Sequence, residues 1–319
     1  MAADPAPPPA GRTFWSPPLV ALMALAALTT PGPRDGSGPL HLVSLTEWRE
    51  PHKGFGGFSG LALDPDGKGF LTVSDRGLLV HAHLERDGAG RLTGATWTDA
   101  KQFLDSKGNE VAGFTSDSEA LRRLPDGRIA VAFEGLARVA AFAPPDMRPM
   151  LLSRWDRFKA FWGNTGMESL AVRPDGSLMT VLELPTADGS YQSFTSKTAP
   201  VWTAGPPLPS DGKFEATDAV WAPDGRLFLL ERNFAVWRGY TTRITAYRMT
   251  DQGFGAPTLL WQSPRGAYGD FEGMDVTTLP SGGLRVTLIT DNNFLPMAAT
   301  MIAELDMAPE AVADGKIDG

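Results

Sequence analysis

A short segment built around a Pro-Asp-Gly turn recurs along the chain and constrains the fold more than any other feature. Four copies carry this turn and a fifth replaces it with Pro-Ser-Gly-Gly: "FSGLALDPDGKGFLTVSDRG" (58–77), "DSEALRRLPDGRIAVAFEG" (117–135), "GMESLAVRPDGSLMTVLEL" (166–184), "ATDAVWAPDGRLFLLERN" (216–233) and "FEGMDVTTLPSGGLRVTLITDNN" (271–293). The turn prolines, at positions 65, 125, 174, 223 and 280, are separated by 60, 49, 49 and 57 residues. Strand-containing repeats of about 40 to 50 residues are typical of propeller blades.

Each copy is predicted to form a β-hairpin. A short apolar strand enters a turn in which proline presets φ, aspartate bonds the local backbone and glycine accepts positive φ. The strand that leaves the turn is rich in β-branched and large apolar residues, as in "RIAVAFE" and "SLMTVLE". Its continuous apolarity indicates burial between neighbouring sheets. Runs between the hairpins, such as "LLVHAHLER" and "TRITAYRM", would complete blades of four strands.

The repeats predict an all-β fold, a β-propeller of four-stranded antiparallel blades. Six blades are favoured, with five or seven as alternatives, because the five hairpins leave further strand-like segments. These segments, "LHLVSLTEW" at 40–48 and "TMIAELDM" at 300–307, are predicted to pair the two chain ends in a shared blade, which would protect the last sheet edge. A β-sandwich or two small β domains is the alternative architecture.

The first 36 residues differ in composition from the rest of the chain. A Pro-rich stretch with one basic residue, Arg12, precedes an apolar run at 19–28. This run is too short to span a bilayer but suits the core of a signal peptide. We therefore expect 1–36 to be a signal peptide or a disordered segment, 37–310 a single propeller domain and 311–319 a C-terminal tail. Export to the periplasm or outside the cell would follow; an uncleaved anchor or a mis-assigned start is the alternative.

Charge and cysteine content exclude several classes of function. The net charge of −8 and the isoelectric point near 5.1 oppose generic nucleic-acid binding, which needs a basic surface. The chain contains no cysteine, which excludes disulfides, thiolate zinc sites and cysteine nucleophiles. The segment around Ser59 lacks the Gly-x-Ser-x-Gly spacing of a nucleophile elbow.

Acidic residues recur at both ends of the hairpins. One set begins them, with Ser59 at this place in the first copy: Glu119, Glu168, Asp218 and Glu272. The other set ends them: Asp75, Glu134, Glu183, Glu231 and Asp291. Equivalent positions of successive blades lie on a common ring, so we expect these nine carboxylates to converge. Clustered like charges need cations or protons, and hard divalent ions, Ca²⁺ above all, match oxygen ligands. The alternative is that some of these acids cap turns, accept backbone N–H bonds or pair with Arg76, Arg122, Arg123 and Arg232.

The repeats together resemble a known family. "FSGLALDPDGKGFLTVSDRG", the "EAL" and "ESL" openings, "LLERN" and "FEGMDV…LITDNN" are similar to the phytase-like domain proteins of bacteria, described as having the esterase-like activity of the phytase family. The resemblance spans roughly residues 40 to 307. It implies a β-propeller with distant similarity to the calcium-dependent alkaline phytases, which hydrolyse phosphomonoesters.

The resemblance also implies roles for individual residues. A divalent cation, Ca²⁺ in the first place, would be held by Asp75, Glu119, Glu168, Glu183, Glu231, Glu272 and Asp291, to which the repeat pattern adds Asp218. Glu134 would take the proton of the attacking water, and Arg76 and Arg232 would offset charge in the transition state. The substrate would contact Arg76, Arg232, Asn233, Asn292 and Asn293. Few other basic residues stand at matching positions, which argues against phytate itself.

The chain is accordingly expected to be a metal-dependent ester hydrolase that takes a small phosphoester or ester and no nucleic acid. Two alternatives stay open at this point. One is a non-catalytic propeller that binds a ligand or a protein and keeps one structural cation. The other is a lactonase-like hydrolase with a single Ca²⁺, which would need fewer acids and no pair of arginines.

Overall fold

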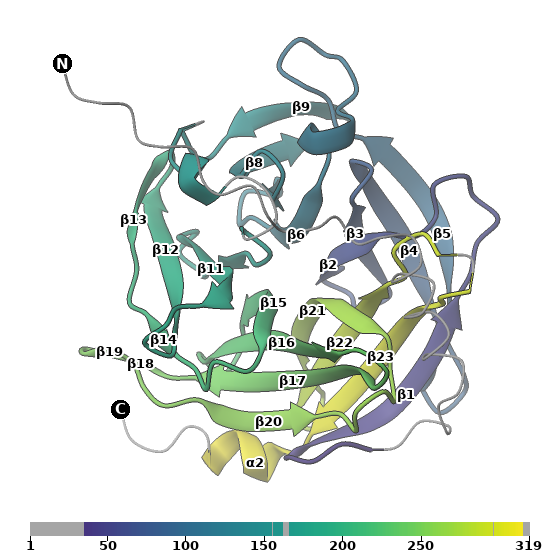
Figure 1. Cartoon of the computed structure of the whole chain (residues 1–319). Helices are drawn as coiled ribbons and strands as arrows, with labels where there is room; N and C mark the ends of the chain where they lie inside the picture. The colour runs from purple at the N-terminus through teal and green to yellow at the C-terminus, as the bar shows by residue number, and fades with distance from the viewer. Residues whose placement is uncertain (1–34, 155, 162–165, 296, 315–319) are drawn as a thin grey trace.

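The computed structural model describes residues 35–154, 156–161, 166–295 and 297–314, with the side chains of 313 and 314 left aside. Five antiparallel sheets stand around a common axis (Figure 1). Residues 1–34 of the predicted signal segment lie outside the described residues. Among the described residues, no helix is long and apolar enough to cross a membrane.

Each sheet is one blade, and its strands follow one another outward from the axis. The first blade consists of β2 (Phe58–Leu63), β3 (Gly69–Ser74), β4 (Leu78–Arg86) and β5 (Leu92–Gln102). The second consists of β6 (Ser118–Arg123), β7 (Ile129–Phe133), β8 (Arg138–Ala143) and β9 (Asp146–Leu151). The third consists of β10 (Ala171–Val172), β11 (Leu178–Pro185), β12 (Ser190–Thr198) and β13 (Val201–Ala204), with β14 (Leu208–Pro209) also paired to β12.

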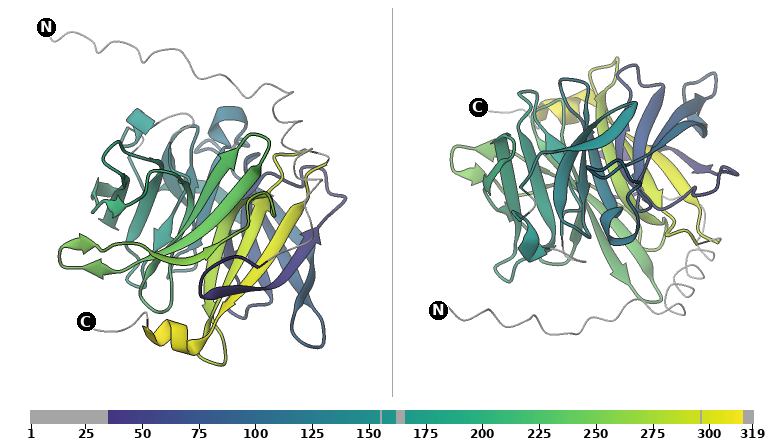
Figure 2. Two further views of the ribbon diagram at one scale, coloured as in Figure 1. Left: turned by 60° about the horizontal axis from the view of Figure 1, so that its bottom comes forward. Right: turned by 90° about the horizontal axis from the view of Figure 1, so that it is seen from above.

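The fourth and fifth blades complete the ring. The fourth consists of β15 (Glu215–Trp221), β16 (Leu227–Ala235), β17 (Gly239–Tyr247) and β20 (Thr258–Gln262). A small hairpin of β18 (Met249–Thr250) and β19 (Gly253–Phe254) projects beyond it (Figure 2). The fifth consists of β21 (Asp270–Thr278), β22 (Leu284–Asp291), β23 (Thr300–Met307) and β1 (Leu40–Trp48). The other elements of the described part of the chain are two 3₁₀ turns (Gly113–Thr115 and Lys159–Phe161) and helix α2 (Pro309–Asp314).

The predicted number of six blades is wrong, because the two chain ends do not form a blade of their own. They do pair, as predicted: β1 lies antiparallel to β23, from Leu40 opposite Met307 to Trp48 opposite Thr300. However, β23 is the third strand of the fifth hairpin's blade and β1 is its fourth. The chain ends therefore complete the fifth blade and cover its edge.

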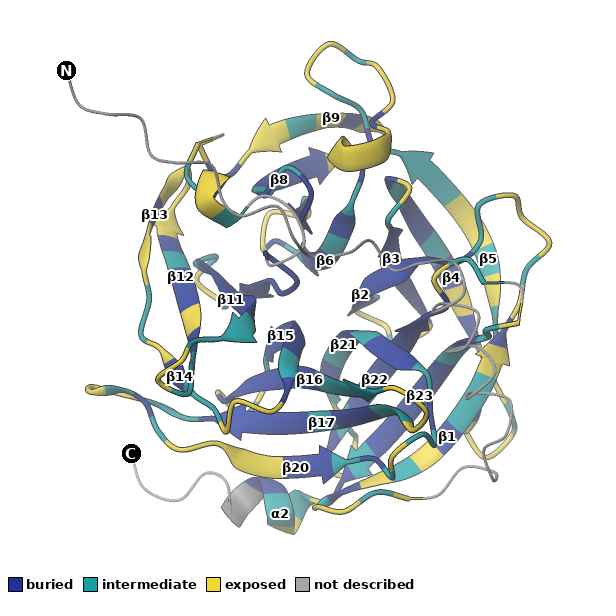
Figure 3. Cartoon of the chain, viewed as in Figure 1, coloured by how far each residue is buried: buried dark blue, intermediate teal, exposed yellow. Residues whose placement is uncertain are grey.

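The hydrophobic core is divided among the five interfaces between blades. Separate clusters of buried side chains lie between each neighbouring pair of blades, including the pair that joins the fifth to the first. The second strand of a hairpin contacts a neighbour on both faces, so β3 and β7 are buried at every position. Figure 3 shows this burial along the inner strands. The continuous apolar runs of the sequence follow from this two-sided contact.

Glycine allows the innermost strands to approach one another at the axis. A Cβ on Gly60, whose φ is +65°, would lie 2.7 Å from the backbone nitrogen of Leu121 in the second blade. A Cβ on Gly273 in the fifth blade would lie 2.6 Å from the carbonyl carbon of Gly60. Three inner strands thus pack backbone against backbone. This close packing brings the ends of the hairpins together around a narrow axis.

Candidate functional site

A β-bulge sets the direction of the acids that begin the hairpins. In four inner strands the pairing register skips one residue, namely Gly60, Glu119, Thr217 and Glu272. A bulge leaves the extra residue outside the regular ladder and re-aims its side chain. Glu119 and Glu272 therefore depart from the alternation of their strands at the end of the axis where these strands begin.

Ten carboxylates gather at this end of the axis among the described residues. We call them the acidic cluster: Asp75, Asp117, Glu119, Glu134, Glu168, Glu183, Glu215, Asp270, Glu272 and Asp291. Seven of them belong to the nine that the sequence predicts to converge. The sequence analysis missed Asp117, Glu215 and Asp270, which each stand two residues before a bulged residue. The i, i+2 spacing in "DSE" and "DFE" is the signal that could have found the first and third.

Two groups of three acids could each surround a cation. Asp75, Asp117 and Glu119 are half-buried, and one oxygen of each lies within 4.8 Å of the others. The same holds for Glu134, Glu168 and Glu183, which are buried. Carboxylate oxygens are ligands of Ca²⁺, which takes about six to eight oxygens in all, and, with stricter geometry, of Mg²⁺. The donor set therefore fits a hard divalent cation.

Burial and mutual repulsion disfavour ionisation of the acidic cluster. Burial, with repulsion from Asp291, Glu272 and Asp117, raises the pKa of Asp75 to about 9. Burial, with repulsion from Asp117 and Glu183, raises the pKa of Glu134 to about 8. The same causes, burial first, raise the pKa well above the ordinary value at Glu119, Glu168, Asp270 and Asp291. Without a bound cation, part of this cluster keeps its protons at neutral pH.

Arg232 is the guanidinium inside the acidic cluster. Its nitrogens lie 3.1 Å from Glu183, 3.1 Å from Asp270, 3.4 Å from Glu215 and 3.5 Å from Glu168, and a further short contact joins it to Glu272. Burial works against its charge, yet the surrounding carboxylates outweigh burial and raise its pKa well above the ordinary value. Asp270 Oδ1 is nevertheless buried without a hydrogen-bond partner among the described residues. One arginine does not balance ten acids.

The register of the fourth blade explains why Arg232 stands there. At the matching place of the second hairpin, the Glu134 N–H bonds the Asp117 carbonyl, and in the fifth hairpin Asp291 lies opposite Asp270. In the fourth hairpin the residue opposite Glu215 is Arg232, and Glu231 lies opposite Ala216. The expectation that Glu231 belongs to the ring is therefore wrong by one residue, and a slip of one turns a strand side chain to the other face.

Glu231 instead lies in the interface between the third and fourth blades. It is fully buried and accepts hydrogen bonds from the Tyr191 hydroxyl at 2.9 Å and the Thr245 hydroxyl at 2.7 Å. Arg243 donates to it at 2.6 and 2.9 Å. These contacts satisfy the carboxylate, so Glu231 has the structural role that the sequence analysis kept as the alternative for such acids.

Asp218 is also separate from the acidic cluster. It belongs to a second set of charges further along the inner strands, which we call the paired layer: Asp64, Arg122, Arg123, Asp218 and Asp275. Arg122 donates to Asp218 at 2.8 Å and to the carbonyls of Leu61 and Ala219 at 2.9 and 2.7 Å. Asp218 also accepts the Met274 N–H at 2.9 Å. Thus the Arg122–Asp218 pair joins four blades across the axis.

The remaining predicted residues lie at different distances from the acidic cluster. Arg76 is exposed, with its guanidinium 3.5 Å from the centre of the Phe294 ring. The Asn293 N–H donates to Asp291 at 2.6 Å, and Asn292 follows the same acid. Asn233 faces elsewhere, since its amide bonds the Lys213 carbonyl and Arg265. The structure therefore brings Arg76, Asn292 and Asn293 to the edge of the acidic cluster but not Asn233.

The family model of the phytase-like proteins, described as esterase-like activity of phytase, matches residues 53–294, and the chain belongs to this family. A search of curated protein sequences finds no match. Among solved structures, a gluconolactonase from Xanthomonas campestris is 12% identical, with a TM-score of 0.47 over 87% of this chain and 96% of that one. An aldose sugar dehydrogenase from Streptomyces coelicolor, in its PQQ-bound form, is 14% identical, with a TM-score of 0.40 over 86% and 99% of the two chains. Likenesses this distant carry no information on activity.

Proposed function

We propose that this phytase-like propeller is a cation-dependent ester hydrolase whose acidic cluster holds divalent cations, Ca²⁺ in the first place. The observation that carries the proposal is the imbalance of charge at one end of the axis. Ten carboxylates face a single arginine among the described residues, and burial raises the pKa of most of them. Such a cluster is stabilised by ions from solution rather than by the chain itself.

Within this proposal the acids have separate roles. Asp75, Asp117 and Glu119 form one candidate ligand group, and Glu168 and Glu183 with Glu134 form another. A cation bound there would act as a Lewis acid toward an ester or phosphoester oxygen. Within the second group Glu168 and Glu183 would hold the cation, and Glu134, left outside its coordination, would take the proton of the attacking water.

The two arginines differ in what they can contribute to the proposed reaction. Arg232 is surrounded by carboxylates, so its role is to fix their positions and to lower their mutual repulsion. Arg76 is exposed at the edge of the acidic cluster and is the candidate to contact an oxyanion of the substrate. The substrate would be a small ester or phosphoester. The composition of residues 1–36 favours export of the enzyme.

A lactonase-like hydrolysis is the second candidate, and the position of Arg232 favours it. The guanidinium already neutralises one side of the acidic cluster, where it contacts acids of the third, fourth and fifth blades. Carboxylates that pair with Arg232 are less available as cation ligands, which matches an enzyme that binds a single cation. One bound Ca²⁺ per chain would support the lactonase-like alternative, and two or more would support a phosphoesterase.

The experiment is a hydrolysis screen coupled to a measurement of cation binding. The protein is freed of ions with a chelator and assayed on p-nitrophenyl phosphate, p-nitrophenyl acetate and a lactone, with and without Ca²⁺. We expect Ca²⁺-dependent hydrolysis of at least one substrate and a loss of at least 10²-fold in Glu168→Gln, as is typical when electrostatic stabilisation of a transition state is removed. Glu310→Gln, an exposed acid on α2, is the matched control. Full activity after exhaustive chelation would sink the proposal.

A further inference from the structure

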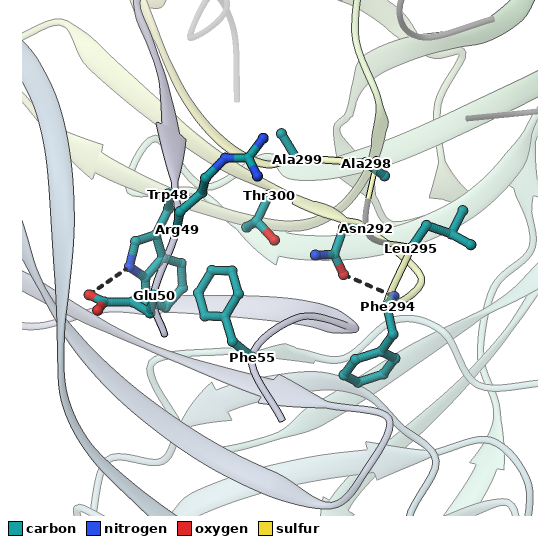
Figure 4. A pocket seen from close by; sticks show the side chains of 10 residues that line it. All are labelled: Trp48, Arg49, Glu50, Phe55, Asn292, Phe294, Leu295, Ala298, Ala299 and Thr300. Carbon is teal, nitrogen blue, oxygen red and sulfur yellow. Dashed lines mark hydrogen bonds between the residues drawn. The ribbon is translucent and has the colours of Figure 1, made fainter. Parts of the chain in front are cut away.

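A pocket of about 270 Å³ lies next to the acidic cluster, between β1 and the segment that joins β22 to β23 (Figure 4). Aromatic rings form part of its wall, namely those of Trp48, Phe55 and Phe294, and the charged Arg49 and Glu50 also line it. Leu295 and Ala298 line the side that faces Trp48. Small-molecule sites are mostly apolar with a few polar groups that fix orientation, and the volume here suits one ring rather than a larger ligand.

Two polar side chains meet inside this pocket. Thr300 is 1% exposed, and its hydroxyl has no hydrogen-bond partner among the described residues. Asn292 is 8% exposed and its Oδ1 accepts the N–H groups of Gly57 and Phe294, both at 3.0 Å. Because two backbone donors identify this atom as the oxygen, the other amide atom is the nitrogen, and Figure 4 shows it directed toward Thr300. A buried hydroxyl without a partner is costly unless a ligand supplies one.

The Phe294 ring is shared between the pocket and the surroundings of the acidic cluster. A Cβ on Gly57 would lie 2.2 Å from Phe294 Cε2 and 3.1 Å from Asp75 Oδ2, so the ring edge and the carboxylate approach the same point. Arg76 lies over the same ring. A molecule with one end at Asp75 therefore has the pocket within reach of its other end.

We infer that this pocket binds the non-reacting part of the ester substrate, a single apolar ring that carries a hydrogen-bond acceptor such as a carbonyl oxygen. The ring packs against Phe55 and Phe294, and the acceptor receives hydrogen bonds from the Thr300 hydroxyl and the Asn292 amide. That the ring belongs to a hydrolysed ester rests on the proposed function. The pocket and its preference for such a ring can be tested without any turnover.

The test is the binding of 4-fluoroacetophenone, a ring with a neutral carbonyl, followed by fluorine NMR on the full chain in the presence of a chelator. Fluorobenzene, which lacks the acceptor, is the comparison probe. We expect 4-fluoroacetophenone to bind more tightly than fluorobenzene by roughly 3- to 10-fold, the value of one or two hydrogen bonds. We expect Thr300→Val, which keeps the shape and removes the hydroxyl, to remove most of that preference.

Filling the pocket is the second arm of the test. Ala298→Phe places a ring in the space, and we expect it to weaken 4-fluoroacetophenone binding by at least 10-fold. Ala89→Phe, at an exposed turn after β4, is the matched control and should bind as the unaltered chain does. Absence of binding to the unaltered chain, or equal binding by Ala298→Phe, would overturn the inference. Since no hydrolysis is measured, an inactive protein that still binds the probe counts against the proposed function alone.

Discussion

The acidic cluster and the paired layer lie a few residues apart on the same innermost strands, and they differ in how far their buried charges are neutralised by partners. In the paired layer each charge has a partner: Asp218 accepts from Arg122 and from two backbone N–H groups. In the acidic cluster five of the ten carboxylates contact Arg232. Burial alone therefore does not distinguish the two sets of acids. They differ in whether the described residues of the chain balance their charge.

The largest effect is expected from breaking the paired layer. Arg122→Met leaves Asp218 buried without its cation and frees the Leu61 and Ala219 carbonyls. Removal of one partner of a buried pair costs about 3–5 kcal/mol of unfolding free energy. Urea denaturation of the variant and of Arg122→Met/Asp218→Leu measures this, and the double variant should recover part of the loss. A loss below about 1 kcal/mol would show that the pair is not a tie between blades.

The acidic cluster predicts a cation-dependent effect of pH on stability. The pKa values of Asp75 and Glu134 in the folded protein are raised to about 9 and about 8, so proton binding by these groups stabilises the folded state. This stability is fully present below the pKa values of the unfolded chain, near 4, and is lost as the pH rises through the folded-state values of about 8 to 9. At one fixed Ca²⁺ concentration, the cation binds more tightly at the pH at which these acids have lost their protons, and a concentration of 100 times the Kd adds about 2.7 kcal/mol. The gain in Tm at this fixed concentration, measured by calorimetry, should therefore be larger at pH 9 than at pH 5. An equal gain at both pH values would contradict the role of these carboxylates.

Arg232 can be removed to sharpen the comparison between the two sets of charges. In Arg232→Gln the acidic cluster loses its guanidinium, which then no longer competes with Ca²⁺ for the carboxylates. We expect the Ca²⁺ affinity to rise by about 10-fold, equal to about 1.4 kcal/mol, or one further ion to bind. Isothermal titration calorimetry reads both quantities. Arg226→Gln, which pairs with Asp224 away from the cluster, is the control. Unchanged affinity and stoichiometry would mean that Arg232 does not occupy a cation position.

The smallest effect is expected at the exposed edge of the acidic cluster. The Glu215 side chain is 42% exposed and contacts Arg232 at 3.4 Å. Exposed ion pairs contribute about 0–1 kcal/mol, so Glu215→Gln should change the unfolding free energy by no more than that. Ca²⁺ affinity should fall less than in Glu183→Gln, in which the altered acid is buried. A larger loss at Glu215 than at Glu183 would place the cation at the rim.

The repeated hairpins were predictable because their signals are local. Turn chemistry at Pro-Asp-Gly and the apolar second strands predict the hairpins, and their spacing predicts blades. The pairing of β1 with β23 was also predictable, since both segments lack another partner. The number of blades was not predictable, because the sequence of a strand does not identify the sheet in which that strand pairs.

The acidic cluster was predictable in part, and its errors have one cause. Glu119, Glu134, Glu168 and Glu183 lie at equal distances from their turns, and the structure brings them together. Asp218 and Glu231 are one residue off that register. Because side chains alternate along a strand, a shift of one residue turns a side chain to the other face of the strand. Counting six residues back from the turn proline reaches Glu119, Glu168 and Thr217, which would have excluded Asp218.

The hairpins, the propeller class and the many acids at recurring positions follow from the sequence alone, because these features depend on turn residues and on the alternation of side chains along strands. Three features depend on the tertiary structure: five blades close the ring, Arg232 enters the acidic cluster while Arg122 crosses the axis, and a small pocket lies beside the Phe294 ring. These features depend on which strands face one another across the axis, and residues that are distant in the chain meet there only after the ring has closed.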